Sequence, residues 1–246
     1  MSYTYGNKDL GLVNKLKLYI LVEDYSGYGE SFLAQHGLSI LISVEANGGS
    51  YNILFDTGTS ADVILHNIRI LGLDLKSIDA IVLSHCHYDH TGGLLGLLKA
   101  MGKRGIPIIA HPNIFKPNFI LRPSLRYVGI PIEISEKVIR DHGGILVLTK
   151  DPLTLFRGVM TTGEITDADI VDFEKKVDTN LYTVKEGKLE KDFMYDEIAL
   201  IINTKYGLVV ITGCAHPGVV SIVKKSMKLV GRDEVLTLVC GFHLIE

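Results

Sequence analysis

One ten-residue segment, residues 84–93, constrains this chain more than any other part of its sequence. It reads Ser-His-Cys-His-Tyr-Asp-His-Thr-Gly-Gly, with His85, His87, Asp89 and His90 inside six residues. The apolar, β-branched run at 78–83 before it predicts a buried strand, and a helix is expected to begin at 91–94. The polar cluster therefore belongs on a loop between a strand and a helix, a common place for a functional site.

The spacing of these four side chains favours metal binding. His85 and His87 are two residues apart, so in extended chain they point the same way and can grip one cation. Asp89 and His90 lie further round the turn and can reach a second cation, which would lie about 3.5–4 Å from the first. The alternative is a polar loop with histidines there by chance. It is disfavoured because a chain with nine histidines in 246 residues would rarely place three of them inside six.

The bulk properties bound the remaining choices. The length suits one large domain over residues 1–246, with 47% apolar residues for its core, and the net charge of −3 argues against nucleic acid or anionic membrane as partner. No apolar run approaches the roughly 18 residues of a membrane span, and the N-terminus lacks a signal-peptide core. The three cysteines form no CxxC pair, which favours a reduced, cytoplasmic setting.

Strands and helices are predicted to alternate, as in a sheet with helices packed on it. Strands are expected at 17–22, 38–44, 51–55, 78–83, 107–110, 198–203, 208–211 and 235–239. Helices are expected at 61–71 (capped by Ser60), 94–101, 135–141 and 219–230. The less regular stretch at 113–195, with a possible hairpin at 185–188, is expected to be a decorating segment or lid.

Candidate site residues recur just after predicted strands. Asp56, His85, His216 and His243 all occupy such positions. Strand ends can meet at one rim of a sheet protein, so these residues predict a metal site assembled from distant parts of the chain. His216 and His243 are expected ligands, and Asp56 is expected to hold a ligand histidine by a hydrogen bond.

Other residues leave alternatives open. Cys214 is expected to be a buried small residue, with a thiolate ligand as the alternative. His111 could line the pocket or have a structural role at the end of its strand. Cys86 lies between two expected ligands and should point away from them. Surface or helix-cap roles are expected for His36, His66 and His142. Four cations could bind a phosphate or be ordinary surface charges: Lys116, Arg122, Arg126 and Arg157.

The motif at 85–90 resembles the HxHxDH signature of the metallo-β-lactamase superfamily, and Phe55-Asp56-Thr57-Gly58 resembles the Asp motif that precedes it. The resemblance implies a four-layer αβ/βα sandwich with a dinuclear site at its rim. It does not fix the reaction, because the superfamily includes lactamases, thioesterases, lactonases, nucleases, phosphodiesterases and oxygen-reducing enzymes.

A narrower resemblance extends over roughly residues 17–244. It rests on the motifs at 53–58, 84–93, 110–112, 127–131, 161–165, 211–218 and 241–244, in that order. They are similar to those of the 7,8-dihydropterin-6-ylmethyl-4-(β-D-ribofuranosyl)aminobenzene-5′-phosphate synthases of methanopterin biosynthesis. This subgroup implies a transferase that joins a dihydropterin methyl diphosphate to a ribofuranosylaminobenzene phosphate and releases diphosphate. Members usually continue to a further histidine-containing turn, so that late ligand is expected either to be missing or to be replaced by His243 or by a residue from another chain.

Two further functions compete with the pterin-condensing transferase. One is a metal-dependent hydrolase of a phosphodiester, thioester or lactone, with Asp89 as the catalytic residue that assists proton transfer. The other is a binding protein that has lost its activity, disfavoured because the motif at 85–90 is intact. The expected cofactor is one or two divalent cations, zinc first, with manganese, iron or magnesium as alternatives. The expected partner is a small phosphorylated substrate; the oligomeric state is left open.

Overall fold

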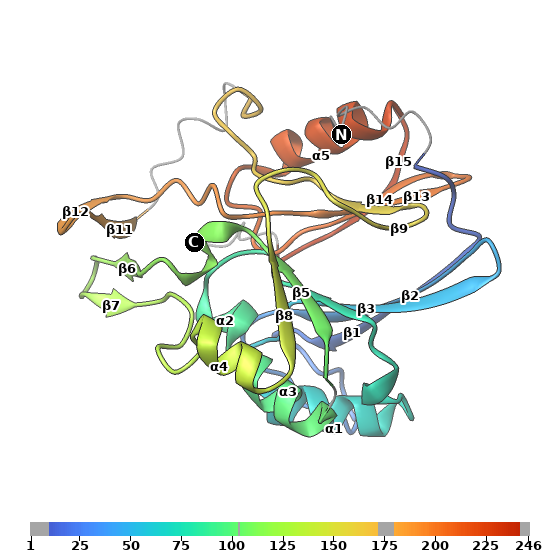
Figure 1. Cartoon of the computed structure of the whole chain (residues 1–246), viewed down its shortest axis with the longest axis horizontal. Coiled ribbons are helices and arrows are strands. Elements are labelled where there is room, and N and C mark those ends of the chain that lie inside the picture. The colour runs from blue at the N-terminus through green and yellow to red at the C-terminus, as the bar shows by residue number, and fades with distance from the viewer. Residues whose placement is uncertain (1–9, 103, 172–179, 242–246) are drawn as a thin grey trace.

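The computed structural model describes residues 10–102, 104–171 and 180–241 (Figure 1). Its largest sheet has the order β1-β2-β3-β4-β5-β8, with β1 at Lys15–Val22, β2 at Ser39–Ala46, β3 at Gly49–Phe55, β4 at Ala80–Val82, β5 at Ile106–Ala110 and β8 at Gly144–Leu148. The second sheet has the order β15-β14-β13-β10-β9, with β15 at Val235–Val239, β14 at Gly207–Ile211, β13 at Leu200–Thr204, β10 at Val159–Thr161 and β9 at Thr154–Phe156.

A third, smaller sheet has the order β12-β11-β6-β7, with β12 at Lys188–Lys191, β11 at Leu181–Lys185, β6 at Asn118–Ile120 and β7 at Arg126–Tyr127. The α-helices are α1 at Ala61–Ile70, α2 at Tyr88–Thr91, α3 at Leu94–Met101, α4 at Glu136–Asp141 and α5 at Val219–Val230. Two 3₁₀ turns are at Leu75–Ser77 and Pro112–Phe115. No described helix is both long and apolar enough to cross a bilayer.

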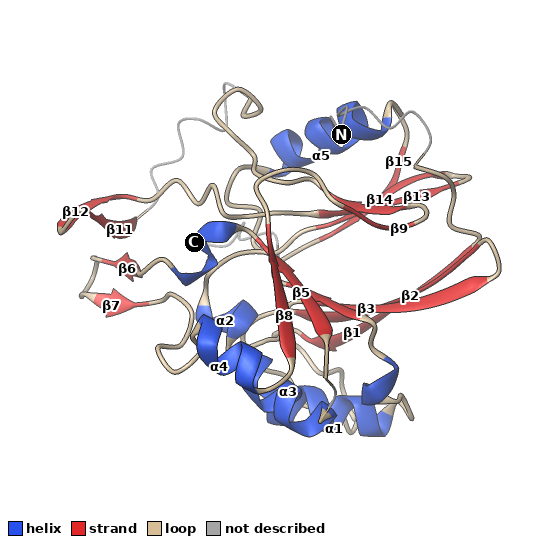
Figure 2. Ribbon diagram, viewed as in Figure 1, coloured by secondary structure: helices blue, strands red, loops and turns tan. Residues whose placement is uncertain are grey.

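Successive apolar residues of the strands face opposite sides and contribute to three separate cores. In β2, Ile40 and Ile42 face the second sheet, whereas Leu41 faces the helices. In β14, Val209 faces the first sheet and Val210 faces α5. Because successive side chains of a strand point to opposite faces, each sheet buries both of its faces. Helices α1–α4 cover the outer face of the first sheet and α5 covers the outer face of the second (Figure 2). The predicted four-layer αβ/βα sandwich is confirmed.

Several local predictions are also confirmed. Ser60 caps α1 by accepting a hydrogen bond from the backbone N–H of Asp62, and the bounds of α5 and β15 match the predicted ranges. The helix predicted at 94–101 is α3, and the structure adds the short α2 before it, which was not predicted; Gly92 and Gly93 join the two. A Cβ on these glycines would lie 2.3 and 2.1 Å from the carbonyl oxygens of Thr59 and Thr57, so only glycine lets the histidine loop approach this connection closely.

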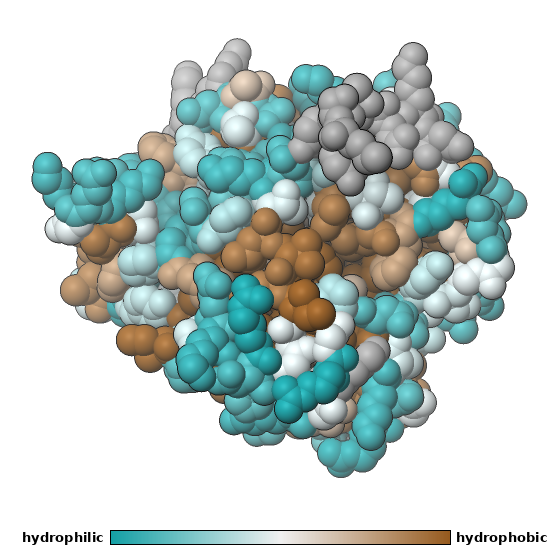
Figure 3. Space-filling view, in the orientation of Figure 1, coloured by the Kyte–Doolittle hydropathy of each residue, from teal (hydrophilic) through white to brown (hydrophobic). Residues whose placement is uncertain are grey.

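The stretch at 113–195 is only partly a decoration. Strands β6, β7, β11 and β12 form the small separate sheet, and the predicted hairpin at 185–188 joins β11 to β12. Strand β8 instead completes the first large sheet, and β9 and β10 complete the second. Figure 3 shows apolar side chains over the centre of one face, where β8 forms a sheet edge with Ile145 half exposed.

Strand direction explains why the candidate residues meet. Strands β3, β4 and β5 run parallel, so the residues that follow them share one edge of the first sheet. Strands β14 and β15 run parallel in the second sheet. The backbone N–H of Ile198 donates to the carbonyl of Ser84, which ties the second sheet to the loop after β4. The two sheets therefore present their loops to one rim.

Candidate metal centre

Five of the sequence-predicted side chains and one cysteine form two overlapping groups at this rim. The possible ligand atoms of His85, His87, Cys214 and His216 all lie within 4.8 Å of one another. The same holds for Asp89, His90 and Cys214. The imidazole centroids of His85 and His216 are 5.0 Å apart although the two residues come from different sheets. The tertiary fold thus brings together the motif at 85–90 and the loop after β14.

Asp56 sets the orientation of two of the histidines. Its Oδ2 atom accepts hydrogen bonds from Nδ1 of His90 at 2.6 Å and from the Ser84 hydroxyl at 2.7 Å. Since the Ser84 hydroxyl proton is used in this way, its oxygen accepts from Nδ1 of His85 at 2.8 Å. Both imidazoles therefore carry a proton on Nδ1 and turn their Nε2 atoms into the site, and for His85 that atom keeps its lone pair.

Asn118 orients His87 through the opposite nitrogen. The Oδ1 atom of Asn118 accepts a hydrogen bond from Nε2 of His87 at 3.1 Å. Its amide is fixed in that direction because Nδ2 donates to Asp192 at 2.6 Å. The lone pair of His87 is thus on Nδ1, which leaves that atom available to a cation. The sequence did not single out Asn118, because an asparagine in a short strand of an irregular segment carries no recognisable signal.

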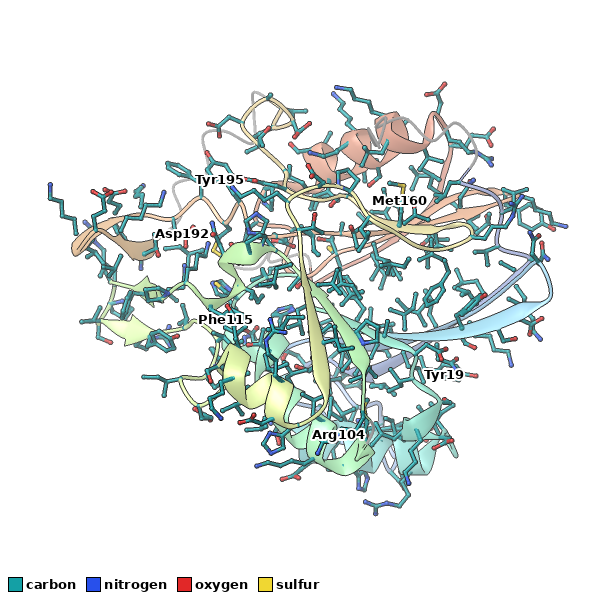
Figure 4. All side chains as sticks on the ribbon, in the orientation of Figure 1. Tyr19, Arg104, Phe115, Met160, Asp192 and Tyr195 are labelled. Atoms are coloured by element: carbon teal, nitrogen blue, oxygen red, sulfur yellow. The ribbon has the colours of Figure 1, made fainter. Side chains whose placement is uncertain are left out.

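Lys116 anchors the same side of the site. Its Nζ atom lies 2.7 Å from a carboxylate oxygen of Asp192 and 2.5 Å from one of Asp196. Asp196 also accepts the backbone N–H of Cys86, between the two histidines. Burial acts to lower the pKa of Lys116, but the charges of Asp196 and Asp192 outweigh it and raise the pKa above its usual value. Lys116 is an internal ion-pair residue and not one of the surface charges or phosphate ligands considered from the sequence. The ribbon around Asp192 is shown in Figure 4.

Glu197 organises the loop after β14. This fully buried carboxylate accepts hydrogen bonds from the hydroxyl of Thr212 and from the backbone N–H groups of Ala215 and His216, at 2.7–2.8 Å. Ala215 has φ of 61°, an uncommon conformation for a residue with a side chain. Burial raises the pKa of Glu197 to about 7, against the lowering effect of these hydrogen bonds. Glu197 was not predicted either, because only the tertiary fold places it beneath this loop.

Burial and neighbouring charges keep the imidazoles of His85 and His87 neutral, so that each has a lone pair for a cation. Burial lowers the pKa of His87 to about 4 and, together with the charges of the neighbouring histidines, holds the pKa of His85 well below its usual value. Burial acts to raise the pKa of Asp89, but its interactions with His90 and His87 dominate and lower it. Near neutral pH the site therefore contains the lone pairs of His85 and His87 and an ionised carboxylate. Burial acts to lower the pKa of His90, but Cys214, Asp56 and Asp89 outweigh it and raise that pKa.

A pocket of about 370 Å³ opens beside the second group. Asp89, His90 and Cys214 contribute to its wall, and its rim carries His36 and two carboxylates. His36 is exposed, as the sequence predicts, but its Nε2 atom is 3.5 Å from Asp89 and its Nδ1 atom is 3.1 Å from Asp24. The volume of this pocket lies at the lower end of the range for small-molecule sites, which is about 300–1,000 Å³. The residues at the pocket rim include Glu23, Asp24, His36, Cys240 and Gly241.

The remaining candidates take structural positions. The side chain of Cys86 is buried in the apolar core beside the helices, away from the histidines, as expected. His111 accepts from the backbone N–H of Asn113 at the start of the 3₁₀ turn that follows β5, and its Nε2 atom is 3.5 Å from Glu164. His66 pairs with the carbonyl of Ser31, and His142 ends α4. His243 lies outside the described residues.

The donor set fits a divalent cation. The Nε2 atom of His85 is completely buried and has no hydrogen-bond partner among the described residues. A buried polar atom without a partner normally costs about 1–3 kcal/mol, so it needs an explanation such as a bound ion. Imidazole, carboxylate and thiol groups together suit zinc, iron or manganese better than magnesium.

Comparison with known proteins agrees with this centre. The family model described as the metallo-beta-lactamase superfamily matches residues 35–166. A Methanocaldococcus jannaschii protein named 7,8-dihydropterin-6-methyl-4-(beta-D-ribofuranosyl)-aminobenzene-5′-phosphate synthase is 48% identical over 97% of this chain and 81% of its own length. A second, uncharacterized protein of that organism is 30% identical over 92% of this chain and 78% of its own length.

A solved structure shares the fold over most of the chain. The crystal structure of Tm1679, described as a metal-dependent hydrolase of the beta-lactamase superfamily, superposes with a TM-score of 0.73 and 27% identity. The match covers 94% of this chain and 78% of that chain. The family model alone spans more than half of the sequence, and the layered sheets and rim histidines agree with it. The chain belongs to the metallo-beta-lactamase superfamily.

Proposed function

We propose that this chain is a metal-dependent transferase that joins a dihydropterin methyl diphosphate to a ribofuranosylaminobenzene phosphate and releases diphosphate. The observation that carries the proposal is the 48% identity to the M. jannaschii synthase over 97% of the chain. The intact motif at 85–90 supports it, because a protein that had lost its activity would have no need to keep these residues. The natural setting of this reaction is the synthesis of a methanopterin-like cofactor in the cytoplasm.

The proposed metal ligands are His85, His87, Asp89, His90 and His216, with His243 as a further ligand outside the described residues. Their lone pairs and charges support this assignment: Nε2 of His85 is buried without a partner, and Nδ1 of His87 is left available by Asn118. Asp56 is the proposed orienting residue, because it holds His90 directly and His85 through Ser84. One or two bound divalent cations, with zinc favoured, would supply positive charge that neutralises the leaving diphosphate.

The chain's own residues would bind and orient the small phosphorylated substrate. The pocket beside Asp89 and His90 is the proposed substrate site, since it is the cavity that reaches the ligand groups directly. Its rim carboxylates, Glu23 and Asp24, suit the amino and N–H groups of a pterin better than a phosphate. The phosphate groups are therefore expected to point inward, and the pterin toward the rim.

A metal-dependent hydrolase is the second candidate. It is favoured by the similarity to Tm1679, which is described as a metal-dependent hydrolase. In this alternative Asp89 has the additional role of accepting a proton from the attacking water. The Asp89 carboxylate is ionised at neutral pH, but its lowered pKa makes it a weak base, which counts against this role.

The deciding experiment supplies both co-substrates to the metal-loaded protein and follows the condensed product and diphosphate by mass spectrometry. The transferase requires both co-substrates and leaves a generic phosphodiester intact. Hydrolysis of the phosphodiester without condensation would overturn the proposal in favour of the hydrolase. The His87→Ala variant controls for contaminating activity, since either reaction of this centre should be lost in it.

A further inference from the structure

Cys214 is the residue for which the sequence left two roles open, a buried small residue or a thiolate ligand. It is the one residue common to both ligand groups found in the described part of the chain. Its Sγ atom is 3.1 Å from Nε2 of His90, and the side chain is almost completely buried. A thiol in this position faces both halves of the site at once.

The surrounding chain is built to present this thiol. Glu197 holds the backbone N–H groups of the next two residues, Ala215 and His216, which fixes the loop without using the cysteine side chain. On the other side, Gly213 packs so closely that a Cβ would lie 2.3 Å from the Ser84 hydroxyl oxygen. Both contacts anchor the loop to the elements that carry the histidines.

A second observation points to a ligand at the same place. The buried Nε2 atom of His85 has no protein partner in the described residues, and it belongs to the group that contains Sγ of Cys214. Cys86 provides a contrast, because it is also buried but packs among apolar side chains of the helix-side core. Cys86 and Cys214 are both buried, but only Cys214 belongs to the ligand group that contains the unpartnered Nε2 atom of His85.

We propose that Cys214 is a thiolate ligand shared by two cations, one held with His85, His87 and His216 and the other with Asp89 and His90. This inference rests on the metal centre of the proposed function and extends it by naming a bridging residue. The thiol would lose its proton to solvent when the cations bind. Because thiolate is a soft ligand, the centre should select zinc, cobalt or iron and reject magnesium.

The test replaces the native metal with Co²⁺ and records the absorption spectrum during the titration. A thiolate bound to Co²⁺ gives an intense charge-transfer band in the near ultraviolet, which imidazole and carboxylate ligands do not give. The parent protein is expected to show this band, and it should keep changing as the second equivalent binds. The Cys214→Ser variant is expected to lose it. The Cys86→Ala and Cys240→Ser variants should retain it, which assigns the band to one sulfur.

Two results would overturn the proposal. Absence of the band from the parent protein would mean that Cys214 is a buried small residue. Completion of the band at one equivalent, with a spectroscopically silent second equivalent, would mean that the thiolate serves a single cation. If Cys214→Ser fails to fold, the Cys214→Asp variant supplies a carboxylate in its place and should bind Co²⁺ without the band. The spectrum needs no substrate, so it tests the role of Cys214 even if the protein fails to catalyse the transferase reaction.

Discussion

Nδ1 of His90 lies 2.6 Å from Oδ2 of Asp56, and both side chains are fully buried at the junction of β3 with the histidine loop. Asp56 itself has φ of 57°, in the left-handed region that aspartate tolerates better than most residues. This conformation turns the carboxylate back toward the end of β4. One carboxylate thereby fixes two imidazoles, His90 directly and His85 through Ser84.

The Asp56→Asn variant should therefore bind metal more weakly. Both carboxylate oxygens accept hydrogen bonds, Oδ1 from the Ser84 N–H and Oδ2 from the Ser84 hydroxyl and His90, so the NH₂ group of an amide would face a donor. The imidazoles would lose their fixed orientation, and affinity should fall by roughly 10- to 100-fold. Competition with a chromophoric chelator measures this loss. The matched control is Asp74→Asn at an exposed 3₁₀ cap, where asparagine caps equally well. Unchanged affinity in Asp56→Asn would refute the positioning role.

The Gly213→Ala variant should be damaged at the contact between the two loops. Its new Cβ would lie 2.3 Å from the Ser84 hydroxyl oxygen and 2.9 Å from Nδ1 of His85, so the two loops must move apart. We expect a loss of about 1–3 kcal/mol in the free energy of unfolding, with reduced metal content. Gly241→Ala is the control, because its nearest contact would be a milder 3.2 Å. Equal effects of the two substitutions in urea denaturation would contradict this reasoning.

The Lys116→Met variant should destabilise the protein strongly. It removes the cation between Asp192 and Asp196 and leaves two carboxylates buried without their partner. Breaking a buried ion pair in this way costs about 3–5 kcal/mol. The exposed pair of Lys137 with Asp141 offers a contrast, and Lys137→Met should change the stability little, because water screens an exposed ion pair. Chemical denaturation of both variants tests the difference, and a similar small cost for both would count against an internal anchor.

Acid should destabilise the metal-free protein over a defined range. The pKa of His87 is about 4 in the folded protein and near its ordinary 6.5 when unfolded, so between these values only the unfolded chain takes up the proton. His85, whose pKa is also lowered, acts in the same direction. Their contribution to the free energy of unfolding therefore falls as pH is lowered from 6.5 toward 4. The raised pKa of His90 has the opposite effect, which fades only as pH rises through that raised value.

Proton NMR of the metal-free protein gives the direct measurement for this window. The imidazole signal of His87 should titrate with a midpoint near 4. His66, which is bound to a carbonyl near the surface, provides an internal reference signal in the same spectra. A midpoint for His87 near 6.5 would show that its imidazole is hydrated rather than buried, and its contribution to the acid-dependent loss of stability should then be absent.

The sequence by itself determined most of the strands and helices and the location of the histidine loop, whereas the four layers were implied by the resemblance to the superfamily. In β2 and β14 apolar residues occupy successive positions, and the fold shows that they face both sides of each sheet. Helix α5 and strand β15 were likewise readable from local pattern. The motif at 85–90 is compact enough to show its chemistry without a fold, and parallel strands place Asp56 beside it at the same edge.

Only the tertiary structure decided how the centre is supported. Glu197, Asn118 and Lys116 carry no local pattern, and their roles arise from partners 15 to 80 residues away. Cys214 meets His90 across 124 residues, so its chemistry depends on how the two sheets face each other. Burial shifts pKa values and fixes tautomers only once neighbours from both sheets have excluded water. Short-range periodicity can indicate which residues turn inward, but it cannot tell which inward residues will meet.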